Sequence, residues 1–167
     1  MTAWDNTKST PLNMASYCRP AEVVWFRIKH SADVTVRDNV ANTSLHLASR
    51  HGNSEVARVL LEHGADVLSR EKGEGIPLHV PAIAGHVEVA RFLLEHGADV
   101  SDRISNGVAS LHVATFYGRV FFARFLIEHG ADASVNPRDG PTRVHLASSC
   151  GYVELARILA EYSADQR

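Results

Sequence analysis

The apolar residues of this chain recur at helical spacing, and the same pattern returns every 33 residues. In one copy Val56, Val59 and Leu60 stand at positions i, i+3 and i+4, whereas Glu55 and Glu62 fall on the opposite face. This arrangement predicts an amphipathic helix of about three turns that buries one face and exposes the other.

A second, shorter helix is predicted ahead of each amphipathic one. Its segment begins at a residue such as Thr43, whose hydroxyl can cap a helix, and ends at a glycine such as Gly52, which tolerates the left-handed backbone of a helix terminus. Each copy therefore predicts two short antiparallel helices and a turn. A unit of this kind cannot bury its apolar face alone, so the copies are expected to stack and complete one another's core.

The copies stay in phase over the whole chain. An Ala-Asp pair marks the end of each one, at Ala32-Asp33, Ala65-Asp66, Ala98-Asp99, Ala131-Asp132 and Ala164-Asp165. A histidine row keeps the same step, at His46, His79, His112 and His145. Five copies account for nearly all of the 167 residues.

The segment around each of these four histidines, and the segment of the first copy that has Asn13 at the same place, resembles the T-P-L-H-x-A signature of ankyrin repeats. The matching stretches are Thr10 to Ala15, Thr43 to Ala48, Ile76 to Pro81, Ala109 to Ala114 and Thr142 to Ala147. The resemblance implies an all-α fold, an ankyrin-repeat solenoid of stacked helix-turn-helix units with hairpin-like turns. It also implies a single domain over 1–167, with repeats at about 5–37, 38–70, 71–103, 104–136 and 137–167.

Some copies depart from the pattern. Pro81 replaces the alanine of the signature and is expected to bend or shorten its helix, because an interior proline removes a backbone hydrogen bond. Ala41 and Glu74 replace the turn glycine found at Gly107, so the turns entering the second and third repeats are expected to deviate from the family's geometry. Phe121-Phe122 replaces a Glu-Val pair and adds apolar surface, which is either core or a second contact site.

Ten histidines raise the question of a metal or catalytic site. Nine of them follow the repeat, and the resemblance implies that the signature histidines hold the turns by hydrogen bonding to the backbone. Equivalent histidines on successive repeats are expected to lie too far apart for ligands that each sit about 2.0–2.1 Å from zinc. No metal, no cofactor and no enzymatic activity are predicted.

Charge and composition point away from nucleic acid and membrane. The formal net charge is −2, and a row of arginines on the second helices, such as Arg58, has glutamates three or four residues away. No apolar run suits a secretory signal or a membrane span. Cys18 and Cys150 are four periods apart, beyond disulfide reach, and reduced thiols suit an intracellular protein. We expect a monomer in the cytoplasm or nucleus, with the cytoplasm favoured.

The resemblance implies a protein–protein interaction module, an adaptor, inhibitor or scaffold, that binds its partner on the concave face made by the turn tips and first helices. The residues that the repeat leaves unexplained on this face are Phe116, Tyr117, Ile83, Val108, Arg50, His51, Arg70, Lys72, Arg103 and Arg138. Phe116 and Tyr117 are adjacent aromatics and are the expected anchor, and the basic residues favour a partner with an acidic contact surface. The other interpretation of these residues is that Phe116 packs on the next repeat and that the arginines only make the protein soluble.

An alternative function is an enzyme or small-ligand binder in the groove, with His51, Tyr117, Asp139 and Cys150 as candidate residues.

Overall fold

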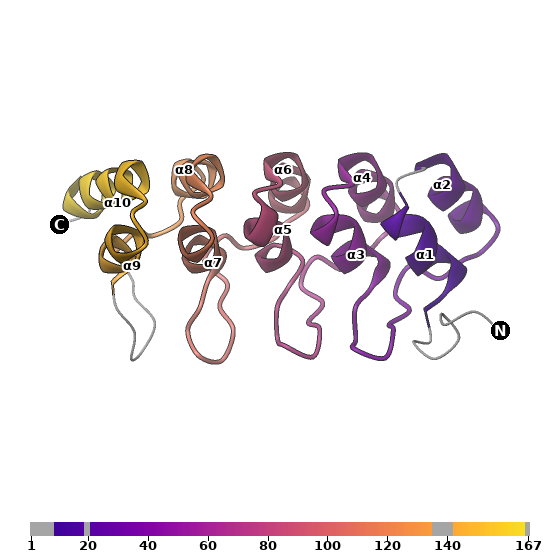
Figure 1. The fold of residues 1–167 in the computed structure, drawn as a ribbon. Coiled ribbons are helices and arrows are strands. Elements are labelled where there is room, and N and C mark those ends of the chain that lie inside the picture. Colours follow the sequence, from indigo (N-terminus) through magenta and orange to yellow (C-terminus); the bar gives the residue numbers. More distant parts are fainter. Residues whose placement is uncertain (1–8, 19–20, 135–141, 166–167) are drawn as a thin grey trace. The chain divides into compact units, whose positions relative to one another are not determined.

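The regular elements in the described part of the chain are all helices, joined by turns, one of which carries an isolated β-bridge between Arg103 and Ala109. The computed structural model describes residues 9–18, 21–134 and 142–165. These residues form ten helices and contain no strand (Figure 1). The helices are α1 (Pro11–Tyr17), α2 (Ala21–Lys29), α3 (Ser44–Arg50), α4 (Ser54–Glu62), α5 (His79–Ala84), α6 (Val87–Glu95), α7 (Ser110–Phe116), α8 (Val120–Glu128), α9 (Arg143–Ser149) and α10 (Val153–Asp165). The predicted all-α solenoid of helix-turn-helix units is confirmed.

The chain divides into two compact units. Unit 1 comprises Met1–Pro81 and Glu88–Ala98, and unit 2 comprises Ala82–Val87 and Asp99–Arg167. In unit 1, α1 packs on α3 and α2 on α4; in unit 2, α7 packs on α9 and α8 on α10 (Figure 1). First helices thus contact first helices and second helices contact second helices. The prediction of one domain with five bounded repeats stays a prediction.

The helical periodicity correctly identifies the buried faces. In α4, Val56 and Leu60 are fully buried, while Glu55 and Glu62 are exposed. In unit 2, Phe122 and Leu126 take the corresponding buried places in α8. Burying side chains of this size contributes about 1.5–3 kcal/mol each, so these inward rows are the main source of stability in each unit.

The signature histidines hold the starts of the first helices, as predicted. Nδ1 of His46 accepts the backbone N–H of Thr43 at 3.2 Å, and its Nε2 lies 3.3 Å from the carbonyl of Gly75 in the next turn. Nδ1 of His112 accepts the N–H of Ala109 in the same way, at 3.0 Å. Because Ala109 has no hydroxyl, the imidazole supplies the cap there.

A second row of histidines forms hydrogen bonds at the C-terminal ends of the second helices. Nδ1 of each ring lies 2.7–2.8 Å from the carbonyl oxygen four residues earlier, at His30, His63, His96 and His129. Since a carbonyl only accepts, Nδ1 of these rings carries the proton. These histidines therefore hold backbone carbonyls as well.

The prediction that two turns deviate is wrong. Ala41 and Glu74 both adopt φ of 63°, the left-handed region in which Gly107 lies at 84°. Each of these three residues donates its N–H to the carbonyl three positions earlier, at 2.8–3.0 Å. The turns keep one hairpin-like geometry because these hydrogen bonds fix it, and the two non-glycine residues bear the strain.

Pro81 shortens its helix without removing a helical hydrogen bond. Helix α5 begins at His79, two residues later in phase than α3 or α7, and is six residues long instead of seven. Pro81 is therefore the third residue of α5, within the first turn, where backbone N–H groups have no intrahelical partner. The predicted shortening is confirmed, and the expected loss of a hydrogen bond is not.

Candidate functional site

Two adjacent aromatic side chains stand on the surface at the end of α7 in unit 2. Phe116 is 58% exposed and Tyr117 is 43% exposed. Their ring centroids are 5.2 Å apart in an edge-on arrangement, which keeps both rings on the surface as one apolar cluster. Their predicted exposure is confirmed, and their role in binding remains a prediction.

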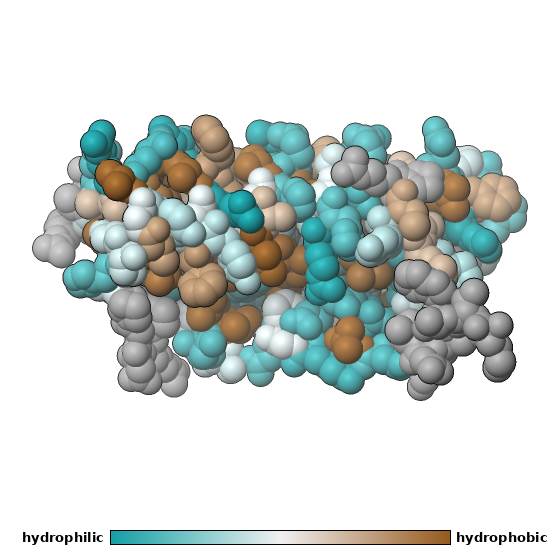
Figure 2. Space-filling model, in the orientation of Figure 1, coloured by the Kyte–Doolittle hydropathy of each residue, from teal (hydrophilic) through white to brown (hydrophobic). Residues whose placement is uncertain are grey.

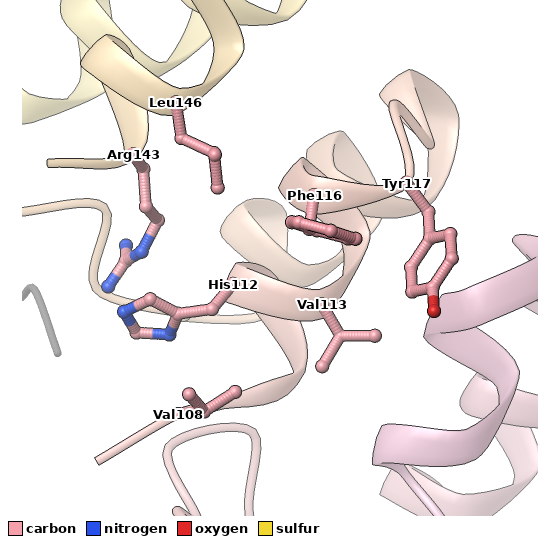
Figure 3. Close-up of a pocket in the computed structure, with 7 residues that line it drawn as sticks. All are labelled: Val108, His112, Val113, Phe116, Tyr117, Arg143 and Leu146. Atoms are coloured by element: carbon pink, nitrogen blue, oxygen red, sulfur yellow. The ribbon is translucent and has the colours of Figure 1, made fainter. Parts of the chain in front are cut away.

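These aromatics line a cavity of about 370 Å³ between α7 and α9. The lining residues are Val108, His112, Val113, Phe116, Tyr117, Arg143 and Leu146 (Figure 3). Figure 3 shows Leu146 extending from α9 toward the α7 side chains, with His112 and Arg143 pointing toward one another at one end. Phe116 therefore shares a cavity with the next repeat and yet stays mostly exposed.

Four of the lining residues were not among the predicted contact residues: His112, Val113, Arg143 and Leu146. Arg143 is the charged one. Only 2% of it is exposed, and its Nη1 donates to the backbone carbonyl of Asp132. Burial, together with the charge of nearby Arg103, lowers the pKa of Arg143 to about 10, and the Asp132 carboxylate opposes that shift. The guanidinium thus remains charged at neutral pH. The available signal was its position, where the other copies have proline or serine: Pro11, Ser44, Pro77 and Ser110.

Ile83, also in unit 2, does not line this cavity. Its side chain is 42% exposed, as expected for a surface position. Its backbone carbonyl accepts a hydrogen bond from Nε of Arg119 at 2.8 Å. Ile83 is thus an exposed apolar residue of the unit, separate from the residues around Phe116.

The corresponding positions in unit 1 are polar. Arg50 is exposed, with Nη2 3.5 Å from Oδ1 of Asn42. The ring of His51 lies edge-on to Tyr17, with centroids 4.2 Å apart. Figure 2 shows the contrast: the surface over α3 is mainly hydrophilic, whereas hydrophobic side chains gather over α7.

The basic residues of the turns support the backbone as well as carrying charge. Nη1 of Arg70 donates to the carbonyl of Glu74 at 2.8 Å, and Arg37 in turn donates to the carbonyl of Arg70. In unit 2, Nη1 of Arg103 lies 3.4 Å from the carbonyl of Gly107. The side chain of Lys72 is exposed. Arg138 lies outside the described residues. These bonds give the arginines a structural role beyond solubility.

In the described residues, the side chains that could bind a metal do not gather in one place. No group of three or more histidine, cysteine, aspartate or glutamate side chains there could hold a metal ion. Of the four candidate residues for an enzyme, His51 lies in unit 1, Tyr117 and Cys150 lie in unit 2, and Asp139 is outside the described residues. Both cysteines are exposed free thiols. No helix in the described ranges has the length and apolarity that crossing a membrane requires.

Comparison with known proteins gives one family. A family model described as ankyrin repeats in three copies matches residues 2–71, 28–104, 69–137 and 101–167. These overlapping matches together span residues 2–167. A search of curated proteins finds no match.

Proposed function

This chain belongs to the ankyrin-repeat family, whose repeats generally act as protein–protein interaction modules, and on that premise we propose that it binds a partner protein on one face. The face is formed by the first helices and the turns before them, the side expected to be concave. It acts there as an adaptor, inhibitor or scaffold without chemistry of its own. Family membership supplies the class of function, and the particular site has to be argued from its residues.

The observation that carries the proposal is the exposed aromatic pair beside a cavity. Phe116 and Tyr117 remain 58% and 43% exposed although both are large and apolar. Protein interfaces are anchored by a few aromatic and arginine side chains that are clustered around pockets. The cluster in unit 2 has this composition, with Arg143 in the wall of the cavity.

The charges on the first helices and turns of unit 1 favour an acidic partner. Arg50, Arg70 and Lys72 are exposed in unit 1, although the chain as a whole carries a formal charge of −2. A local excess of positive charge steers acidic partners and suppresses basic ones. Overall acidity disfavours nucleic acid as the ligand. The proposal includes a monomeric chain acting in the cytoplasm, or in the nucleus.

The test is affinity capture from a lysate of the source cells. The natural chain is compared with a Phe116→Ala/Tyr117→Ala variant and with Phe121→Ala, which removes an equally apolar side chain that is 82% exposed on α8. A partner retained by the natural chain and by Phe121→Ala, but weakened about 30-fold or more by the double variant, is the expected result. Circular dichroism confirms that each variant is folded. Equal capture by all three chains would place the binding anchor elsewhere.

A small-ligand binder is the second candidate, because the cavity volume of about 370 Å³ lies at the lower end of the range seen for ligand sites. An enzyme on the same groove is the wider form of this alternative. If no chain captures a protein, screening small apolar compounds by thermal shift is the next test. A shift of several degrees that disappears in Phe116→Ala would favour this candidate over the protein partner.

A further inference from the structure

Helix α2 of unit 1 exposes apolar side chains at two places that are buried in the next copy. Val23 is 43% exposed and Phe26 is 53% exposed. Their counterparts on α4, 33 residues later, are Val56 and Val59, which are both buried. Val23 and Phe26 therefore lie on a helix face that is covered elsewhere in this protein.

The helices of the preceding copy cover this face. Helix α4 packs on α2, and α10 packs on α8; Val56 of α4 and both Leu155 and Ile158 of α10 are buried. The described residues contain no copy after α10, so a following copy is not needed for this burial. Helix α2 has a following copy, but in the described residues no helix precedes α1 (Figure 1). A helix that lay on α2 as α2 lies on α4 would therefore bury Val23 and Phe26.

Arg27 indicates the charge that such a helix has to carry. The other copies all have leucine at this place, and Leu60 in unit 1 and Leu159 in unit 2 are fully buried. Arg27 is exposed and lines a cavity of about 270 Å³ beside Phe26 and His30. A covering helix would remove the guanidinium from water, and burying an unpaired charge is costly. A carboxylate on that helix would offset the cost through a charge-assisted hydrogen bond.

The rest of α2 is also more basic than its counterpart. It carries Arg27 and Lys29 against Glu22, whereas α4 carries Arg58 against two glutamates. Asp33 lines the same cavity as Arg27, but its Oδ1 accepts the N–H and the hydroxyl of Thr35, at 2.8 and 2.7 Å. The exposed surface of α2 therefore favours an acidic partner.

We propose that this end of unit 1 docks an acidic amphipathic helix of a partner protein, whose apolar side chains cover Val23 and Phe26 and whose carboxylate pairs with Arg27. The site involves none of the residues around Phe116 and thus goes beyond the proposed function. A terminal repeat normally has a polar outer face, and large apolar side chains exposed together indicate an interaction surface.

A second copy of this chain is a poorer occupant than a separate acidic helix. Its α10 would have to take the place of the covering helix. Helix α10 has Ala160 where α8 has the buried Ile127, so it offers less apolar surface for the contact.

The experiment selects ligands on the full natural chain from a phage-displayed library of amphipathic helices. The selected helices are expected to share an aspartate or glutamate beside their apolar row. Replacing that acid by its amide should weaken binding about 10-fold, and replacing the central apolar residue by alanine about 30-fold or more. These changes are made in the peptide, so they cannot unfold the protein.

Variants of the protein then locate the bound helix, with circular dichroism as the check that each is folded. Phe26→Ala should weaken binding about 30-fold, whereas Phe121→Ala, which removes a side chain 82% exposed on α8, should leave it unchanged. Arg27→Leu gives α2 the leucine of the other copies. This variant should bind the acidic helix and its amide form equally, because the cation that distinguishes them is gone.

Enrichment of no helix would overturn the proposal. Binding that survives Phe26→Ala, or that is lost in the Phe116→Ala/Tyr117→Ala variant, would place the helix elsewhere and also overturn it. Equal binding of the acidic and amide helices to the natural chain would overturn the pairing with Arg27.

A last measurement asks whether the protein covers this end itself. Trp4→Phe leaves Trp25 of α2 as the single tryptophan, and Trp25 is 46% exposed. Acrylamide should quench its fluorescence efficiently in the free chain. A Trp25 that is protected from quenching would show that other residues of the protein already cover α2, and the proposal would be wrong.

Discussion

Helix α3 with its turn in unit 1 and helix α7 with its turn in unit 2 have the same backbone conformation. The surface of the first is polar, and the surface of the second is apolar. Nδ1 of His46 and of His112 caps the two helices identically. In unit 1 Asn42 is buried, bonds through Nδ2 to the Asp38 carboxylate at 3.1 Å and contacts Arg50.

In unit 2 the places of Asn42 and Arg50 are taken by Val108 and Phe116, and no such polar network can form there. The two helices thus share the side chains that hold the backbone. They differ at a few positions that do not hold it, and these positions decide whether the surface is polar or apolar. An apolar cluster that persists on a surface is a mark of binding. The two units are a natural control for one another.

The largest expected effect is at Gly118, a glycine of unit 2 that Tyr152 approaches closely, compared with Gly64, a glycine at the end of α4 in unit 1 whose added Cβ would have no neighbour within 4 Å. A Cβ at Gly118 would lie 2.6 Å from Cζ of Tyr152, and its φ of +64° already disfavours any side chain. Gly64 in unit 1 has φ of +85° and nothing within 4 Å of a Cβ. Gly118→Ala should lower the free energy of unfolding by about 3 kcal/mol and Gly64→Ala by about 1 kcal/mol. Urea denaturation measures both, and equal losses would refute the close approach of Tyr152.

Acid should weaken unit 1 through His46. Burial is the main cause that lowers the pKa of His46 below its ordinary value of 6.5. The unfolded chain then takes up a proton at higher pH than the folded chain, so stability is complete above that value and falls as pH drops below it. The slope cannot exceed about 1.4 kcal/mol per pH unit for one proton.

Urea unfolding between neutral and mildly acidic pH tests this for the natural chain and for His46→Gln. The variant should lack this part of the pH dependence, whatever its stability at neutral pH. His145→Gln, which changes an exposed signature histidine in unit 2, is the control and should keep it. An unchanged slope in His46→Gln would show that other groups cause the acid effect.

Two turns of unit 1 should become more stable when they receive the glycine that unit 2 already has at the same turn position. Ala41 and Glu74 sit at φ of 63°, whereas unit 2 has Gly107 in the same turn position. Ala41→Gly and Glu74→Gly should each raise the free energy of unfolding by about 0.5–1 kcal/mol, and Gly107→Ala should lower it by about 1 kcal/mol. Thermal unfolding reports the sign directly. Destabilisation by both glycines would mean that chain entropy outweighs the backbone strain.

The smallest expected effect is on the outer face of the second helices. In α4, Arg58 pairs with Glu55 at 2.6 Å. In α8 the place of that glutamate is taken by Phe121. The matching arginine, Arg124, pairs instead with Glu154 on α10, at 3.4 Å. Phe121→Glu restores the spacing of α4 and should gain about 0.2–0.5 kcal/mol at low salt. Repeating the measurement in high salt should remove the gain, and a gain that survives salt would not be ionic.

Much of the fold could be predicted because its causes lie close together in the sequence. The i, i+3, i+4 spacing of Val56, Val59 and Leu60 identifies a buried helix face wherever the helix packs, and all three are buried. The histidine caps act across only three residues, and the resemblance to ankyrin repeats implied them. Two expectations failed for a different reason. The start of α5 shifts so that Pro81 removes no helical hydrogen bond, whereas the turn at Ala41 keeps its hydrogen-bonded geometry and the residue takes the left-handed backbone.

By itself the sequence determined the helix pairs and their inward rows, since both follow from local periodicity. The exposure of Phe116 and Tyr117 was expected from the resemblance to ankyrin repeats, with packing of Phe116 on the next repeat as the other reading. Only the tertiary structure decided that Phe122 is buried and Phe121 exposed, that Arg143 is buried, and that α7 and α9 enclose a cavity. These outcomes depend on which side chains of one repeat meet those of the next. That meeting is set by the packing of whole helices, because a side chain's burial depends on its spatial neighbours and not on its place in the repeat.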